Sequence, residues 1–196
     1  MRLNELTNQF NQNHPELDGV AQEGIISAEH VHALRSIFDA KIVSLSRRQE
    51  LADHERMFVD YSLDMGARCL TYWLERYDLP LPQSTPAIQI VNRLRASVRA
   101  SGYSDDETAP IFSTNEMLAD KALFIRLLGS MSGGGMAIDR LKSSTRAPVE
   151  EAARNVLAFM TVLADENPSG LPVDDYLSGN IKNMLAHYEL TQQPSS

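Results

Sequence analysis

At 196 residues, of which 43% are hydrophobic, the chain is long enough to bury one sizeable core and short enough for a single domain to be expected. Its formal net charge of −8 at pH 7 disfavours unspecific attraction to nucleic-acid phosphates and anionic membranes, so a contact with either requires a local basic patch. One cysteine, Cys69, cannot form an intramolecular disulfide, and no apolar run approaches the roughly 20 residues that span a bilayer. We therefore expect a cytoplasmic protein with no signal peptide and no membrane partner.

A short amphipathic helix is expected to open the chain. Leu3, Leu6 and Phe10 recur at helical spacing, and the helix should stop before Pro15 because the residue preceding a proline is pushed out of the helical region. We assign residues 1–24 to this helix and a linker.

The next helix is expected to begin at Ser27, whose hydroxyl is a suitable N-cap. Its apolar face consists of Val31, Leu34, Phe38, Ile42 and Leu45. A single rod over residues 28–77 would be about 75 Å long at 1.5 Å per residue, which is longer than a compact domain of this size can bury. We therefore favour a break near Ser44 and Ser46, and hence two helices.

Residues 47–77 contain no proline and are apolar around most of the helical circumference. The polar residues follow nearly one line: Asp53, Arg56, Asp60, Asp64, Arg68, Thr71 and Glu75. The aromatic residues are expected in the core and at its rim: Tyr61, Tyr72, Trp73 and Tyr77. A helix of this kind belongs inside a bundle, so we predict that residues 47–77 form its central helix.

Prolines separate this helix from the next one. Pro80 and Pro82 exclude a helix interior because they lack an amide donor, and Thr85 is expected to cap a helix that starts at Pro86 and runs to about Ser101. Farther along, Ser113 and Glu116 have capping-box spacing and open a helix that should reach Leu128.

The last third of the chain is divided by a glycine-rich hinge at residues 129–135. After it, Pro148 starts a helix that ends before Pro168, and a final helix is expected at about residues 173–190. No strand-turn-strand pattern is found, so no sheet is expected. The sequence thus predicts an all-α fold: a single-domain bundle of six or seven helices within residues 25–190, around a long central helix, with a disordered tail at residues 191–196.

Catalytic and metal sites find weak support in the sequence. Glu29 and His32 have the spacing of helical di-metal ligands, but such a site needs a second pair and none is found. Glu50 and His54 lie four apart, which suits either acid–base chemistry or a surface contact. The hinge at residues 129–135 could hold a phosphate, but it lacks the lysine of a P-loop. We assign no catalytic residue, cofactor or metal.

Basic residues provide the candidate partner-binding site. They are Arg93, Arg95 and Arg99, on a helix without acids, and Arg140, Lys142 and Arg146, which follow the hinge. For the first three, internal ion pairs are the favoured explanation, with Asp105, Asp106 and Glu107 or with the polar line of residues 47–77. The sequence therefore favours a non-catalytic helical protein–protein interaction module, such as an adaptor, chaperone, immunity or regulatory protein, whose partner is another protein or a second copy of itself. The alternative is a nucleic-acid-associated regulator that uses the basic residues.

Overall fold

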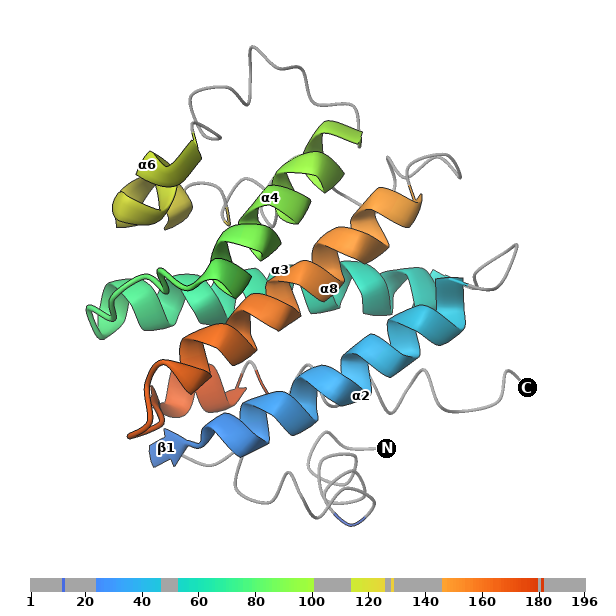
Figure 1. Ribbon diagram of the computed structural model, residues 1–196. Helices are drawn as coiled ribbons and strands as arrows, with labels where there is room; N and C mark the ends of the chain where they lie inside the picture. The colour runs from blue at the N-terminus through green and yellow to red at the C-terminus, as the bar shows by residue number, and fades with distance from the viewer. Residues whose placement is uncertain are drawn as a thin grey trace.

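The computed structural model describes residue 12 and residues 24–46, 53–100, 114–125, 128, 146–179 and 181 (Figure 1). Within them the protein is mostly helical. The elements, in chain order, are β1 (Gly24–Ile26), α2 (Ala28–Ser46), α3 (Asp53–Arg76), α4 (Thr85–Ala100), α6 (Thr114–Ala119), α8 (Arg146–Asp165) and β2 (Leu171–Val173). Residues 121–125 and 175–179 are also helical. None of the helices in this part of the chain is both long enough and apolar enough to cross a membrane.

Among the described elements, α8 is the helix that packs against α2, α3 and α4. In Figure 1, α2, α8 and α4 lie side by side, and α3 crosses behind them. Every residue from 155 to 161 is buried, so α8 is enclosed on all sides over this stretch. The structure therefore does not confirm residues 47–77 as the central helix, because α8 occupies that place and α3 lies across it.

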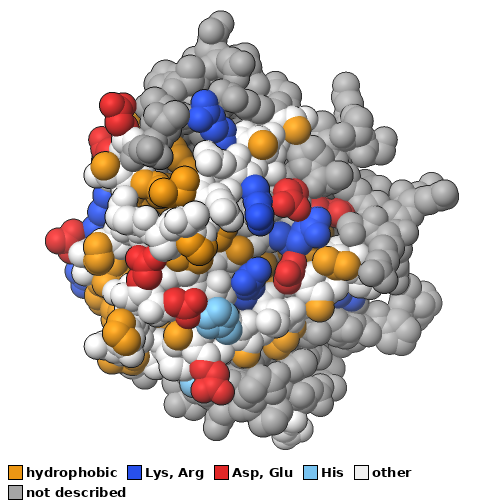
Figure 2. All heavy atoms as spheres, in the orientation of Figure 1, with side chains coloured by type: hydrophobic (Ala, Val, Ile, Leu, Met, Phe, Trp, Pro, Cys, Tyr) orange, Lys and Arg blue, Asp and Glu red, His pale blue; other side chains and the backbone are white. Residues whose placement is uncertain are grey.

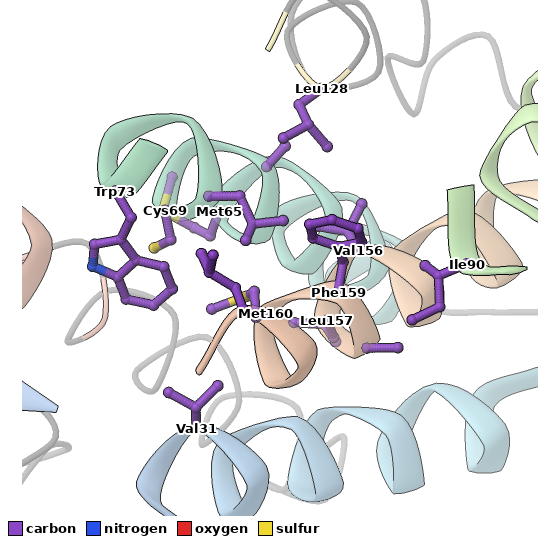
Figure 3. Close-up of a cluster of buried hydrophobic side chains, with 14 of the residues drawn as sticks. Val31, Met65, Cys69, Trp73, Ile90, Leu128, Val156, Leu157, Phe159 and Met160 are labelled. Carbon is purple, nitrogen blue, oxygen red and sulfur yellow. The ribbon is translucent and has the colours of Figure 1, made fainter. Parts of the chain in front are cut away.

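The core lies between α3 and α8, with contributions from α2 and α4 (Figure 3). Its buried side chains include Met65, Cys69 and Trp73 of α3, Val156, Phe159 and Met160 of α8, Val31 of α2 and Ile90 of α4. Burial raises the pKa of the Cys69 thiol to about 12. The thiol therefore stays protonated and packs as a small hydrophobic group.

Serine side chains cap the starts of α2 and α4. Ser27 is the N-cap of α2, since its Oγ accepts a hydrogen bond from the N–H of His30 at 3.2 Å. The cap of α4 is Ser84 rather than Thr85, because the Ser84 Oγ accepts from the N–H of Ala87 at 3.4 Å. α2 and α3 are separate helices, as favoured, and residues 47–52 between them lie outside the described residues.

Two predicted helices differ from the expectation within the described residues. The helix expected to reach Leu128 is interrupted at Asp120, whose Oδ1 accepts hydrogen bonds from the N–H groups of Ala122 and Leu123 at 3.0 and 3.2 Å and so caps a new turn. The final helix begins after Asp174 rather than at residue 173, because Asp174 caps it and Val173 belongs to β2.

A small antiparallel sheet corrects the expectation that the chain has none. β1 pairs with β2 through Gly24 with Val173, Ile25 with Pro172 and Ile26 with Leu171. Gly170 permits this pairing, because its φ of 82° is left-handed and a Cβ on it would lie 2.8 Å from the carbonyl oxygen of Ile26. Strands of three residues are too short to show the alternation that identifies a strand in sequence.

Several expectations fall outside the described residues. They concern the N-terminal helix apart from residue 12, the hinge at residues 129–135 and the tail at residues 191–196.

Gly66 allows α3 and α8 to approach each other, because a Cβ at this position would lie 2.7 Å from Cγ1 of Val156. We expect Gly66→Ala to lower the free energy of unfolding by about 1–2 kcal/mol, since overpacking costs about 1–3 kcal/mol and the better helix propensity of alanine offsets only part of it. Urea unfolding measures the change.

Gly179 supplies the matched control, because it is helical and a Cβ there meets no atom within 4 Å. Gly179→Ala is therefore expected to be neutral or to stabilise the protein by about 0.5–1 kcal/mol. If both variants unfolded at the same urea concentration as the wild type, the close approach of α3 and α8 would be wrong.

Candidate functional site

The candidate site lies where the last turns of α3 meet the chain that follows β2. The indole Nε1 of Trp73 donates a hydrogen bond to the carbonyl oxygen of Pro172 at 3.0 Å, which holds β2 against α3. Tyr72 precedes Trp73 on α3, and its hydroxyl donates a hydrogen bond to the carboxylate of Asp174. Asp174 is placed for this contact because it also caps the helix that follows β2.

Three tyrosines surround this link, and we call Tyr72, Tyr77 and Tyr176 the tyrosine cluster. The ring of Tyr72 lies 4.9 Å from that of Tyr176 and 5.8 Å from that of Tyr77, measured between centroids, and the second pair is edge-to-face. Both separations suit favourable aromatic pairing. Tyr176 is 50% exposed, so a large ring is held at the surface by a neighbouring ring.

A depression of about 280 Å³, open to solvent, lies beside the cluster and is lined by Tyr72, Glu75 and Arg76. Arg68, one turn earlier on α3, donates from Nε to Oδ2 of Asp64 at 2.7 Å. The pKa of Arg68 is raised chiefly by Asp64 and in part by Tyr176. The spacing of four residues places Asp64 and Arg68 on the same face of α3, where such pairs form.

The hydrogen bond between Tyr72 and Asp174 determines the protonation state of both side chains. It raises the pKa of Tyr72 to about 12, with Asp174 as the largest cause, and it lowers the pKa of Asp174, to which the N–H of Leu177 also donates. At neutral pH the phenol therefore stays protonated and the carboxylate stays ionised. A phenol in this state is a poor general base, so the link is better suited to holding the site together than to proton transfer.

The predicted basic residues are partly described. Arg93 is exposed on α4, whereas Arg95 is half-buried and interacts within the structure. Arg99 lies in the last turn of α4 and Arg146 begins α8; their side chains, and all of Arg140 and Lys142, lie outside the described residues. α4 packs against α8, and Figure 1 shows the end of α4 and the start of α8 at the same end of this helix pair.

On the face shown in Figure 2, which α2, α4 and α8 form, lysine and arginine side chains are interspersed with acidic ones. This face therefore presents mixed charge rather than a uniform basic patch. The helix ends that carry Arg99 and Arg146 lie at the same end of the α4–α8 pair, but the charge visible on this face does not separate into one sign.

The histidine candidates have structural partners. His32 Nε2 lies 2.7 Å from Oδ1 of Asp165, which joins α2 to the end of α8 at the surface. His30 Nδ1 lies 3.1 Å from the hydroxyl of Ser27, within the cap of α2. In the described part of the chain, no group of three histidine, cysteine, aspartate or glutamate side chains is arranged to hold a metal ion. The side chain of His54 and all of Glu50 lie outside it.

The sequence places Tyr72 and Tyr77 in the core or at its rim, and both pack half-buried against the core, but it does not reveal the site that they form with Tyr176 and Asp174. The sequence holds one local signal for this site. Asp174 and Asp175 stand side by side before Tyr176, and an acidic residue at this place is typical of a capped helix start. That signal does not reveal the partner on α3.

Comparisons of the chain with protein-family models, with curated proteins and with solved structures find no match. The site is therefore interpreted from its own geometry.

The link between Tyr72 and Asp174 depends on pH in two windows. The folded-state pKa of Tyr72 lies above the ordinary value of 10.0, so its contribution to stability is complete below pH 10 and is lost as the pH rises through about 12. The folded-state pKa of Asp174 lies below the ordinary value of 3.8, so its contribution is complete above that value and is lost as the pH falls through the lowered pKa.

We expect Asp174→Asn to move the pKa of Tyr72 from about 12 toward 10.0, because the charged acceptor that stabilises the phenol is removed. The ultraviolet difference absorbance of ionised tyrosine measures this titration. Asp175→Asn is the control, since Tyr72 donates to Asp174 and not to this neighbour. Equal titration curves for the wild type and Asp174→Asn would contradict the link.

Proposed function

We propose that this protein is a non-catalytic helical module that binds another protein through the tyrosine cluster. The observation that carries the proposal is the ring of Tyr176, which is half-exposed and rests on Tyr72, itself hydrogen-bonded to Asp174. The ring offers apolar area at the surface and a hydroxyl that can still form polar contacts.

Interface energetics support this role for Tyr176. Tyrosine, tryptophan and arginine dominate binding hot spots, and a side chain that is already held in place loses less conformational freedom when a partner binds. The depression beside the ring, with Glu75 and Arg76 on its border, supplies the polar rim that surrounds such anchors.

The chemistry of the nucleophilic side chains near the site favours binding over catalysis. The phenol of Tyr72 has a raised pKa, and the thiol of Cys69, also on α3, is buried with a raised pKa. A buried thiol that remains protonated is neither a nucleophile nor a metal ligand. These two groups therefore support a structural rather than a chemical role for this end of α3.

We propose that residues 25–190 act as one bundle domain in the cytoplasm, where a single cysteine remains reduced. The partner is a different protein or a second copy of this chain. In a symmetric dimer the same surface patch is used by both copies, so Tyr176 would contact the same patch on its partner.

A nucleic-acid-associated regulator is the second candidate, and the observation that favours it is the meeting of the end of α4 with the start of α8. This arrangement places the backbone positions of Arg99 and Arg146 at one end of the molecule, although they are far apart in sequence.

We expect partner capture by the full-length protein from native extract to be reduced at least tenfold by Tyr176→Ala, because loss of a hot spot costs about 2 kcal/mol or more and about 1.4 kcal/mol is a factor of ten. Arg93→Ser is the control, since Arg93 is exposed on α4, away from the tyrosine cluster. Affinity capture with quantitative mass spectrometry, together with size measurement, gives the result. A strict monomer that retains no protein partner would count against the proposal.

The second candidate makes the opposite prediction for these two variants. If nucleic acid is the partner, Arg93→Ser weakens binding and Tyr176→Ala does not, and the affinity falls steeply as the salt concentration rises. Fluorescence anisotropy with labelled DNA and RNA tests this, and undetectable binding at low salt removes the second candidate.

A further inference from the structure

We propose that the tyrosine cluster docks a basic segment of the partner protein and that a lysine or arginine side chain of this segment enters the depression beside Tyr72 and Glu75. This inference rests on the proposed function, because it specifies the chemistry of the partner at the same surface.

The charge balance around the depression favours a cation. Arg68 is paired with Asp64, whereas Arg76, which also lines the depression, forms no ion pair among the described residues. Glu75 and Asp175 are exposed and form no ion pair with any cation among the described residues. The three carboxylates of Glu75, Asp174 and Asp175 thus outnumber the one unpaired arginine described beside them, Arg76, and the local charge beside the tyrosines is negative.

The backbone adds to this field. The depression lies at the C-terminal end of α3, where the helix macrodipole is equivalent to a partial negative charge and where the last carbonyl groups lack intrahelical donors. The helix that follows β2 begins beside the tyrosine cluster with a partial positive charge. This charge is already neutralised, because the carboxylate of Asp174 accepts hydrogen bonds from the N–H groups of Tyr176 and Leu177. Side-chain and backbone charges thus act in the same direction.

The aromatic rings provide a second attraction for a cation. A lysine or arginine over the face of a tyrosine is stabilised by about 0.5–1 kcal/mol at an exposed site and by more when water is excluded. Tyr176 offers such a face because half of the residue is exposed. The net charge of −8 also speeds the approach of a basic partner over a long range.

The basic-segment proposal is tested with two fluorescein-labelled peptides, octalysine and octaglutamate, added to the full-length protein, with binding followed by fluorescence anisotropy. We expect octalysine to bind and octaglutamate not to bind. Tyr176→Ala and Glu75→Gln are each expected to weaken octalysine binding by about fivefold, the size of one exposed cation–π contact or charge contact. Circular dichroism confirms that both variants fold.

Glu116→Gln is the matched control, because Glu116 is an exposed carboxylate on α6, outside the tyrosine cluster. An unchanged affinity in Tyr176→Ala and Glu75→Gln, or an equal loss in Glu116→Gln, would mean that octalysine is attracted by the overall negative charge, and the proposal would be overturned. A partner whose capture depends on Tyr176 but which is not displaced by octalysine would overturn the basic-segment proposal and leave the proposed function standing.

Discussion

The contact between Gly66 of α3 and Val156 of α8 is the constraint on which the rest of the structure depends. It brings the two helices close enough for their buried side chains to fill the space between them, and α8 then supports α2 and α4 on its other sides. Farther along α3, the indole of Trp73 donates a hydrogen bond to the carbonyl oxygen of Pro172. The distance between α3 and α8 therefore also determines where β2 lies. The candidate site is thus a consequence of core packing.

Local signals predicted the helices well, because caps and apolar spacing act over a few residues. The cap at Ser27 and the end of α8 before Pro168 are as expected, and Thr85 was wrong by one position. The place of α8 at the centre was not predictable in this way. Its small residues, such as Ala152 and Ala153, let neighbouring helices approach on several sides, but which helix becomes enclosed depends on the packing of all of them.

The candidate site was less accessible from sequence than the fold. Tyr72 was expected in the core or at its rim and lies half-buried there, yet its acceptor Asp174 is 102 residues away, and no local pattern specifies a contact at that separation. The basic residues were found from charge alone, which cannot show that Arg95 interacts within the fold or that acids lie among the basic side chains on one face. Charge patterns in a sequence therefore identify candidates, whereas the tertiary structure decides which charges have partners.

Strands β1 and β2 join the residues just before α2 to those just after α8, so the ladder closes a loop of chain that contains most of the described helices. The two strands are far apart in sequence, and strands of three residues cannot by themselves offset the chain entropy lost when so long a loop closes, so the ladder depends on the packing of the helices between them. Because Asp174 follows β2 directly, the position of Tyr176 depends on this ladder, and a partner that recognises the ring therefore recognises only the chain in which the helices between the strands are packed.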